Sequence, residues 1–294
     1  MLHLKHRRKM RKLFGLLLVC FIFFSSITST GTVKAEQGEP PEKILVIGGG
    51  EAAATEALYA GRLLLKSKDG QNWNFICGLT LLDPVTVITS GHCVESLIAE
   101  NFMVQLGVKD TTKLENQVLR KVVQIIMHPG HTIKNTVIYD VALLRLDQPS
   151  PYNEHIQPLS LAKHSVDWYP QIDIFGFGIT SLEQKISSPI LKKASGHFGY
   201  FEERLVFGFT FWLKFVFGAS CFGDSGSAYV GYENGQPVLL GMNSTSDCET
   251  TALSPNLSPL GPTQVANAPE EDFYNWIKSH LLQNKTYFPM FHSS

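Results

Sequence analysis

The chain has 294 residues, of which 44% are hydrophobic and 17% charged. This composition is typical of a globular protein with a well-buried core, and it excludes a disordered chain. The formal net charge of −1 is unevenly distributed, because residues 1–35 hold seven Lys or Arg and no acidic residue. The other residues hold 18 basic and 26 acidic side chains, a net charge of −8. A mildly acidic domain repels phosphate backbones, so we expect no nucleic-acid partner.

Residues 1–35 are expected to be a cleaved signal peptide. A basic stretch that ends at Lys12 precedes an apolar run over residues 13–27, and Val33-Lys34-Ala35 forms a small-residue cleavage site. The run is shorter than the roughly 20 residues that span a bilayer. We therefore expect a secreted protein, extracellular or periplasmic. The alternative is an uncleaved leader that anchors the chain in a membrane.

A glycine-rich turn follows the leader. Residues 43–53 hold Gly48, Gly49 and Gly50 between apolar and alanine-rich stretches, like the entry of a dinucleotide-binding fold. That motif needs a β–α–β unit and an acidic residue about twenty positions further on. Residues 66–76 are polar instead and run directly into an apolar strand. We therefore expect no dinucleotide and no other cofactor.

Short apolar segments between turn residues predict strands through most of the chain. The predicted strands cover residues 76–82, 86–88, 102–106, 118–127, 141–146, 172–175 and 238–242. Residues 147–161 hold three prolines and are expected to connect two groups of strands. Between Glu270 and Leu282, apolar residues recur at three- and four-residue steps, which predicts one C-terminal helix.

A series of phenylalanines precedes the last predicted strand. Its members are Phe207, Phe209, Phe211, Phe215 and Phe217. A spacing of two places such residues on one face of a strand. We expect this face to pack in a core, and the alternative is an exposed patch that binds a hydrophobic partner or a membrane.

Three short blocks carry residues suited to nucleophilic catalysis. The segment Gly223-Asp224-Ser225-Gly226 presents a serine between turn-forming residues, where its hydroxyl can lie beside backbone N–H groups. Upstream, Ser90-Gly91-His92-Cys93 supplies a base and Tyr139-Asp140 an orienting acid. A serine hydroxyl needs such a base at neutral pH, and the acid fixes the tautomer of the imidazole.

These blocks, in the order His, Asp, Ser, resemble the trypsin/chymotrypsin family of serine peptidases. Residues 77–82 resemble the family's CGGSLI strand, 90–93 its AAHC block, 127–129 its HP turn, 176–178 its GWG, and 273–277 its helix ending in WI. The resemblance covers residues from about 46 to 283. It implies an all-β fold of two packed antiparallel Greek-key β-barrels with a C-terminal α-helix.

The resemblance also implies a domain organisation. Residues 36–45 would form a pro-segment and 46–294 the peptidase domain. Within that domain, the first barrel would cover about 46–146, the strap about 147–161, the second barrel about 162–268 and the helix about 270–282.

The family resemblance assigns a role to each residue of the three blocks. Ser225 would be the nucleophile, His92 the general base and Asp140 the orienting acid. The backbone N–H groups of Gly223 and Ser225 would form the oxyanion hole. The expected function is a secreted serine endopeptidase that hydrolyses protein or peptide substrates through an acyl-enzyme. The alternative is a catalytically impaired peptidase-fold binding protein.

Val46-Ile47-Gly48-Gly49 resembles the family's IVGG, the new N-terminus of a cleaved zymogen. In the family, the freed ammonium pairs with the acid before the serine, here Asp224. Cleavage after Lys43 would free Ile44, two residues before Val46. Activation after Leu45 would need a different activating peptidase, or activation would follow another route. An ordinary turn carboxylate is the alternative role of Asp224.

The resemblance places Ala219 at the base of the specificity pocket and Ser244, Thr245 and Ser246 on its wall. A base without a carboxylate implies a small or medium uncharged P1 residue in the substrate. Asp247 is the alternative acid at the pocket rim. A proteinaceous inhibitor is a further possible partner.

Four cysteines remain once Cys20 is removed with the leader. In an oxidising compartment they predict two disulfides, for which three pairings exist. The family resemblance implies the pairs Cys77–Cys93 and Cys221–Cys248. No pair has the two-to-four-residue spacing of a zinc site, so we expect no metal.

Overall fold

The computed structural model describes residues 49–131, 139–203, 209–246, 263–267 and 271–281. By its internal contacts the chain divides into two units, Met1–Pro40 and Pro41–Ser294, and every described residue lies in the second. The expected signal peptide and pro-segment lie outside the described residues, as do Phe207, Asp247 and Cys248. No helix in the described ranges is long and apolar enough to cross a membrane.

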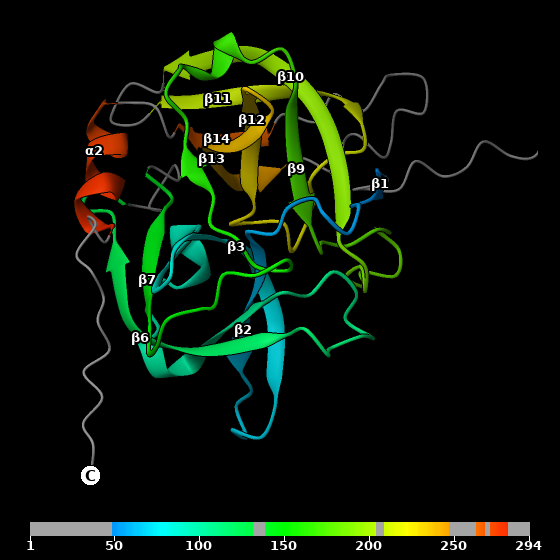
Figure 1. Ribbon diagram of the computed structural model, residues 1–294, viewed down its shortest axis with the longest axis vertical. Helices are drawn as coiled ribbons and strands as arrows, with labels where there is room; N and C mark the ends of the chain where they lie inside the picture. Colours follow the sequence, from blue (N-terminus) through cyan, green and yellow to red (C-terminus); the bar gives the residue numbers. More distant parts are fainter. Residues whose placement is uncertain (1–48, 132–138, 204–208, 247–262, 268–270, 282–294) are drawn as a thin grey trace, which may run out of the picture. The chain divides into compact units, whose positions relative to one another are not determined.

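Six antiparallel strands close the first barrel, in the lower half of Figure 1. They are β2 (Ala60–Lys66), β3 (Trp73–Asp83), β4 (Thr86–Thr89), β5 (Phe102–Leu106), β6 (Val118–Met127) and β7 (Ala142–Leu146). Their order around the barrel is β2-β3-β4-β7-β6-β5. β5 pairs with β2 and so closes the barrel, which joins two segments that are distant in the sequence.

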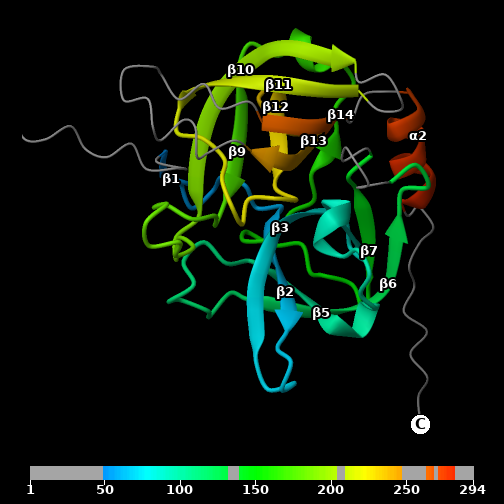
Figure 2. The ribbon, with the colours of Figure 1, turned by 180° about the vertical axis from the view of Figure 1, so that it is seen from behind.

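A second sheet follows in the chain and appears in the upper half of Figures 1 and 2. Its strands are β1 (Gly50–Glu51), β8 (Ser160–Leu161), β9 (Ile172–Gly176), β10 (Lys192–Glu203), β11 (Phe209–Phe217), β12 (Ala228–Glu233), β13 (Gln236–Ser246) and β14 (Thr263–Asn267). Because β9 pairs with both β10 and β12, six of these strands close a ring in the order β9-β10-β11-β14-β13-β12. This order repeats the connectivity of the first barrel.

Two short strands lie outside this ring. β1 pairs with β10, although the segment from residue 46 onward was expected in the first barrel. β8, at the end of the expected strap, pairs in parallel with β13.

Buried apolar side chains form one cluster inside the first barrel, one within the second sheet and one between the two. The first barrel encloses Leu63, Leu81, Val104 and Leu144, each fully buried. A second cluster centres on Tyr169, Ile174, Tyr229 and Leu240. A third cluster contains Ile88 and Leu143 from the first barrel and Phe175, Val230 and Leu239 from the second sheet. The two sheets therefore share one continuous apolar contact.

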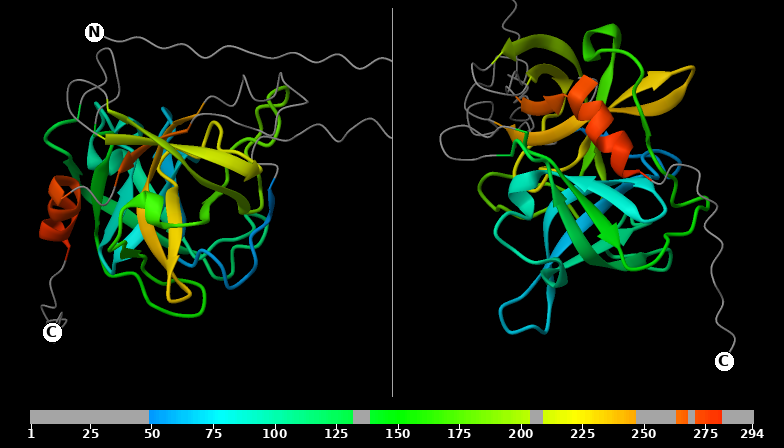
Figure 3. Two further views of the ribbon diagram at one scale, coloured as in Figure 1. Left: turned by 90° about the horizontal axis from the view of Figure 1, so that it is seen from above. Right: turned by 90° about the vertical axis from the view of Figure 1, so that its left-hand side faces the viewer.

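The helix α2 (Glu271–His280) lies beside β7 in Figures 1 and 2, and faces the viewer in the right-hand view of Figure 3. Ile277 is fully buried, and the Trp276 ring meets the His128 ring edge-on at 4.8 Å. The Arg145 guanidinium of β7 donates to the carbonyl of His280. A cation at a helix C-terminus is favourable, so this contact anchors the end of α2. Single 3₁₀ turns occur at Gly91–Cys93 (η1), Ala99–Asn101 (η2) and Val166–Trp168 (η3).

The all-β fold class expected from the sequence is confirmed, with a closed barrel, a second sheet and one C-terminal helix. β11 contains four of the five phenylalanines in the series, and their side chains lie outside the described set. Leu213, which interrupts the series, is buried.

The barrel core supplies a stability prediction. Leu81 of β3 is fully buried, whereas Leu119 of β6 is 43% exposed. We expect Leu81→Ala to lower the free energy of unfolding by about 2–5 kcal/mol, because the lost contacts leave a cavity. Leu119→Ala should stay within about 0.5 kcal/mol of the parent, as surface substitutions do. Urea unfolding followed by fluorescence measures both, and equal losses would contradict this description of the core.

Candidate active site

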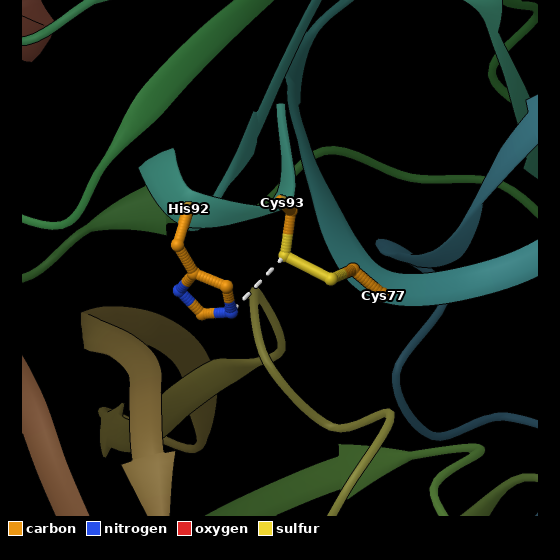
Figure 4. A group of neighbouring side chains, drawn as sticks. All are labelled: Cys77, His92 and Cys93. Carbon is orange, nitrogen blue, oxygen red and sulfur yellow. Dashed lines mark hydrogen bonds between the residues drawn. A yellow bond between two sulfur atoms is a disulfide. The ribbon is translucent and has the colours of Figure 1, made fainter. Parts of the chain in front are cut away.

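His92 lies in the 3₁₀ turn η1, directly after β4. The neighbouring Cys93 forms a disulfide with Cys77 of β3, as Figure 4 shows. This bridge ties the turn to the wall of the barrel. The Nε2 atom of His92 lies 3.7 Å from the Cys93 sulfur.

Asp140 holds His92 through two hydrogen bonds. Asp140 Oδ2 lies 2.7 Å from His92 Nδ1, and Oδ1 accepts the His92 backbone N–H at 2.8 Å. Burial alone would lower the pKa of His92, but the hydrogen bond and the charge of Asp140 outweigh it and raise that pKa above its usual value. Burial raises the pKa of Asp140, and the bonds from His92 and Ser244 reverse this shift and lower it. The pair therefore favours a charged carboxylate beside an imidazole.

Ser244 completes the hydrogen bonding of Asp140. Its buried hydroxyl donates to Asp140 Oδ2 at 2.5 Å, and its carbonyl accepts the Ser225 hydroxyl at 3.3 Å. The sequence placed Ser244 only on the pocket wall, and no sequence pattern indicated its bond to Asp140.

Ser225 lies in a turn that is anchored to both sheets. Its carbonyl accepts the Gly78 N–H of β3 at 2.8 Å, and the Gly226 N–H donates to Asn243 of β13 at 2.8 Å. Gly226 has φ +81°, and a Cβ there would lie 2.3 Å from the Gly78 carbonyl oxygen, so only glycine fits. Both Ser225 and His92 are described, and no hydrogen bond joins their side chains.

The expected oxyanion donors are free to bind a ligand. Phe222 accepts the Ile179 N–H at 2.9 Å through its carbonyl. Because the C=O and N–H of a trans peptide point in opposite directions, the Gly223 N–H points away from Ile179. Gly223 adopts φ +94°, which favours glycine. Within the described part of the chain, neither the Gly223 nor the Ser225 N–H has an acceptor.

Asp224 is fully buried, and among the described residues only backbone N–H groups donate to its carboxylate. Gly178 donates to its Oδ1 at 2.8 Å and Cys221 to its Oδ2 at 2.9 Å. Burial raises the pKa of Asp224 to about 7 despite these two bonds. A Cβ at Gly176 or Gly178 would lie 2.0 or 2.3 Å from this carboxylate, so the two glycines leave the space that it occupies.

The structure describes only some of the residues expected in the specificity pocket and in the second disulfide. Ala219 is 5% exposed, and the adjacent Ser220 hydroxyl lies 3.4 Å from the Tyr229 hydroxyl. The backbone of Thr245 and Ser246 belongs to β13, while their side chains lie outside the described set. Cys221 is disulfide-bonded, and its expected partner Cys248 lies outside the described residues.

Cys77, His92 and Cys93 place their potential ligand atoms within 4.8 Å of one another. Both sulfurs are used in the disulfide, and metal binding requires thiolates. The group therefore serves to brace His92.

Comparisons with known proteins identify the family to which the sequence is similar. Residues 46–258 match the sequence model of the family described as Trypsin. The chain is 32% identical to the thrombin-like enzyme flavoxobin of Protobothrops flavoviridis, over 48% of this chain and 52% of that protein. It is 25% identical to chymotrypsin-like elastase family member 1 of Bos taurus, over 90% of this chain and 98% of that protein. It is 29% identical to trypsin eta of Drosophila melanogaster, over 50% of this chain and 56% of that protein. The chain thus spans about half the length of two of these three relatives.

The raised pKa of Asp224 predicts a pH-dependent stability. Between its ordinary pKa of 3.8 and about 7, the folded chain keeps a proton that the unfolded chain loses. The free energy of unfolding should therefore fall as the pH rises from 4 through 7, by up to about 4 kcal/mol from this group. Chemical unfolding of the uncleaved chain and of Asp224→Asn at each pH measures the change. The Asn variant should show a shallower fall, and parallel curves would rule out the shift.

Proposed function

The chain belongs to the trypsin family, and we propose that it is a secreted serine endopeptidase. It hydrolyses peptide bonds of protein or peptide substrates through an acyl-enzyme on Ser225. The observation that carries this proposal is the bond of 2.7 Å between His92 and Asp140, linked through Ser244 to the Ser225 hydroxyl. The expected leader supports secretion. We also propose two further partners, a proteinaceous inhibitor and an activating peptidase.

The chemistry follows from the proton positions at His92. Because Nδ1 donates to Asp140, the neutral imidazole carries its lone pair on Nε2. Rotation of the Ser225 hydroxyl away from Ser244 lets Nε2 take its proton during attack on the substrate carbonyl. His92 then returns the proton to the leaving amine, while Asp140 stabilises the imidazolium. Because the pKa of His92 is raised, kcat/KM should increase with pH until the imidazole is neutral.

The two free N–H groups of Gly223 and Ser225 stabilise the oxyanion that forms on the carbonyl. One such donor contributes about 3 kcal/mol to the transition state. Their orientation depends on the segment 221–225, which Asp224 holds through Cys221 and Gly178.

We also propose that cleavage after Leu45 supplies a cation for Asp224. A buried carboxylate without a counter-ion is costly, and an ammonium would compensate it. Gly49 N lies 2.8 Å from the Cβ position of Gly218, so the N-terminal segment reaches the loop that leads to Asp224. Three residues, 46–48, span up to about 10 Å. Under the same proposal, Cys248 pairs with Cys221.

Two contacts favour a second function, that of a catalytically impaired peptidase-fold binding protein. The Ser225 hydroxyl bonds to the Ser244 carbonyl, and the Nε2 atom of His92 contacts the Cys93 sulfur. Catalytic hydrogen bonds often form only once substrate is bound. We therefore place the peptidase first.

Ser225→Ala tests the choice between the two functions. We expect it to abolish peptide hydrolysis and labelling by a fluorophosphonate, because the variant lacks the hydroxyl that we propose as the nucleophile. Ser160→Ala, at an exposed serine of β8, is the control and should keep both activities. Thermal melting shows whether each variant folds. Absence of labelling in the parent chain would favour the binding protein, and labelling of Ser225→Ala would move the nucleophile elsewhere.

The proposed preference for an uncharged P1 residue depends on Ala219. A Lys or Arg side chain at the pocket base would bury its charge beside Ala219 and Ser220, without a partner. We expect cleavage after Ala, Val or Leu to exceed cleavage after Arg at least tenfold, about 1.4 kcal/mol. A peptide-library digest measures this ratio, and Ala219→Asp should shift it toward Arg and Lys. A parent preference for Arg or Lys would point to Asp247 as the acid that meets the substrate.

A further inference from the structure

A half-buried arginine without an acidic partner lies near the expected oxyanion site. Arg62 of β2 donates from Nη1 to the side-chain oxygen of Gln105 at 2.8 Å. Its Nε atom is buried and has no hydrogen-bond partner, and among the described residues no carboxylate pairs with its guanidinium. Taking a cation out of water without an opposite charge is unfavourable, so other contacts must offset this cost. The sequence motifs gave no reason to single out Arg62.

Two aromatic rings supply such contacts. The guanidinium carbon of Arg62 lies over the Phe75 ring at 4.7 Å from its centre, and 5.4 Å from the centre of the Phe177 ring. The face of an aromatic ring attracts a cation, and more strongly where both are shielded from water. The two rings also meet each other edge-on, with their centres 6.3 Å apart. Phe75 belongs to β3 and Phe177 directly follows β9, so this group of three side chains connects the first barrel with the second sheet.

The same group contacts the segment that carries the expected oxyanion donors. A Cβ on Gly223 would lie 3.3 Å from Phe75 Cε1 and 3.1 Å from the Gly178 Cα atom. The ring and the Gly178 backbone therefore occupy the side of Gly223 where a side chain would be. Gly178, which follows Phe177, also donates its N–H to Asp224. The group thus touches Gly223 directly and reaches Asp224 through one peptide.

We propose that Arg62 is a positioning residue for the oxyanion site: its guanidinium holds the Phe75 ring against Gly223 and so fixes the direction of the Gly223 N–H. The proposal rests on the proposed peptidase function. Glycine adopts many backbone conformations, so a fixed N–H direction at Gly223, at φ +94°, needs support from neighbouring groups. A displaced donor stabilises the oxyanion of the transition state less, while binding of the uncharged substrate carbonyl changes little.

Three variants separate this role from a general loss of stability. Arg62→Met keeps an apolar stem but removes the charge, so both ring contacts weaken. Arg62→Lys keeps the charge and loses the planar guanidinium. Arg120→Met is the matched control, because Arg120 of β6 is also half-buried but its guanidinium binds the Pro149 carbonyl and no described ring. Thermal melting first shows which variants fold, and Arg62→Lys carries the test if Arg62→Met does not.

The first measurement is hydrolysis of a peptide amide substrate. We expect Arg62→Met to lower kcat about fivefold, less than the roughly hundredfold that loss of a whole donor causes, and to leave KM within about twofold. Arg62→Lys should lose about twofold in kcat, because it keeps the charge over the rings. Arg120→Met should match the parent. An unchanged kcat in Arg62→Met, an equal fall in Arg120→Met, or a raised KM with kcat unchanged overturns the proposal.

The second measurement requires no activity. Labelling the full-length protein with ¹³C-carbonyl phenylalanine and ¹⁵N-glycine selects the amide signals of its Phe–Gly pairs, which include Gly178 and Gly223. Phe222→Leu removes one pair and so assigns the Gly223 signal. Because an aromatic ring shifts the NMR signal of a nearby amide, Arg62→Met should move the Gly223 signal, and Arg120→Met should leave it in place.

The two measurements distinguish the role of Arg62 from the peptidase function. An unchanged Gly223 signal in folded Arg62→Met overturns the proposal, whatever the kinetics show, and so does an equal shift in Arg120→Met. Absence of hydrolysis in the parent counts against the peptidase function instead. The amide signals then decide alone whether Arg62 fixes the Gly223 peptide.

Discussion

The buried carboxylate of Asp140 joins the parts of the molecule that the site needs. It precedes β7 of the first barrel, binds His92 in the turn after β4, and accepts the hydroxyl of Ser244 from β13 of the second sheet. A buried charge is tolerated only when its oxygens are paired, so these three groups must converge. The barrel and the second sheet are therefore constrained to meet at this carboxylate. Because Asp140 binds Nδ1 of His92, its position also sets the direction in which Nε2 points.

The position of Ser225 depends on a second connection between the sheets, made by backbone rather than side-chain hydrogen bonds. Gly78 of β3 donates to the Ser225 carbonyl, and Gly226 donates to Asn243 of β13. Glycine at 78 and 226 allows this approach, because a Cβ at either position would meet the backbone of the other segment at 3.0 Å or less. The serine is thus held by the junction of the sheets, and only its hydroxyl remains to rotate.

Local patterns predicted strands in which apolar residues predominate between turn residues. The segments 102–106 and 118–127 were predicted with the bounds that β5 and β6 have, and β7 and β9 differ by one residue. β2, β10 and β12 were not predicted, because glycines interrupt their apolar pattern and they form by pairing with distant strands. Gly231 of β12, for example, leaves room for the Tyr169 ring, a contact that no local pattern indicates. The bond between Ser244 and Asp140 was missed for the same reason, since a single polar residue gains its meaning only from its neighbours in space.

Asp140 and Asp224 show how partners, rather than burial, set the charge of a site. Burial raises the pKa of both carboxyl groups. Around Asp140 an imidazole and a hydroxyl reverse this effect, and the pKa falls below its usual value. Around Asp224 two backbone N–H groups are too weak to do so, and the pKa stays near 7. The Asp140 carboxylate is thus charged and paired with His92 and Ser244. Asp224 bonds to the backbone of Cys221 and Gly178, so the position of Gly223 and Ser225 depends on a carboxyl group whose charge changes near neutral pH.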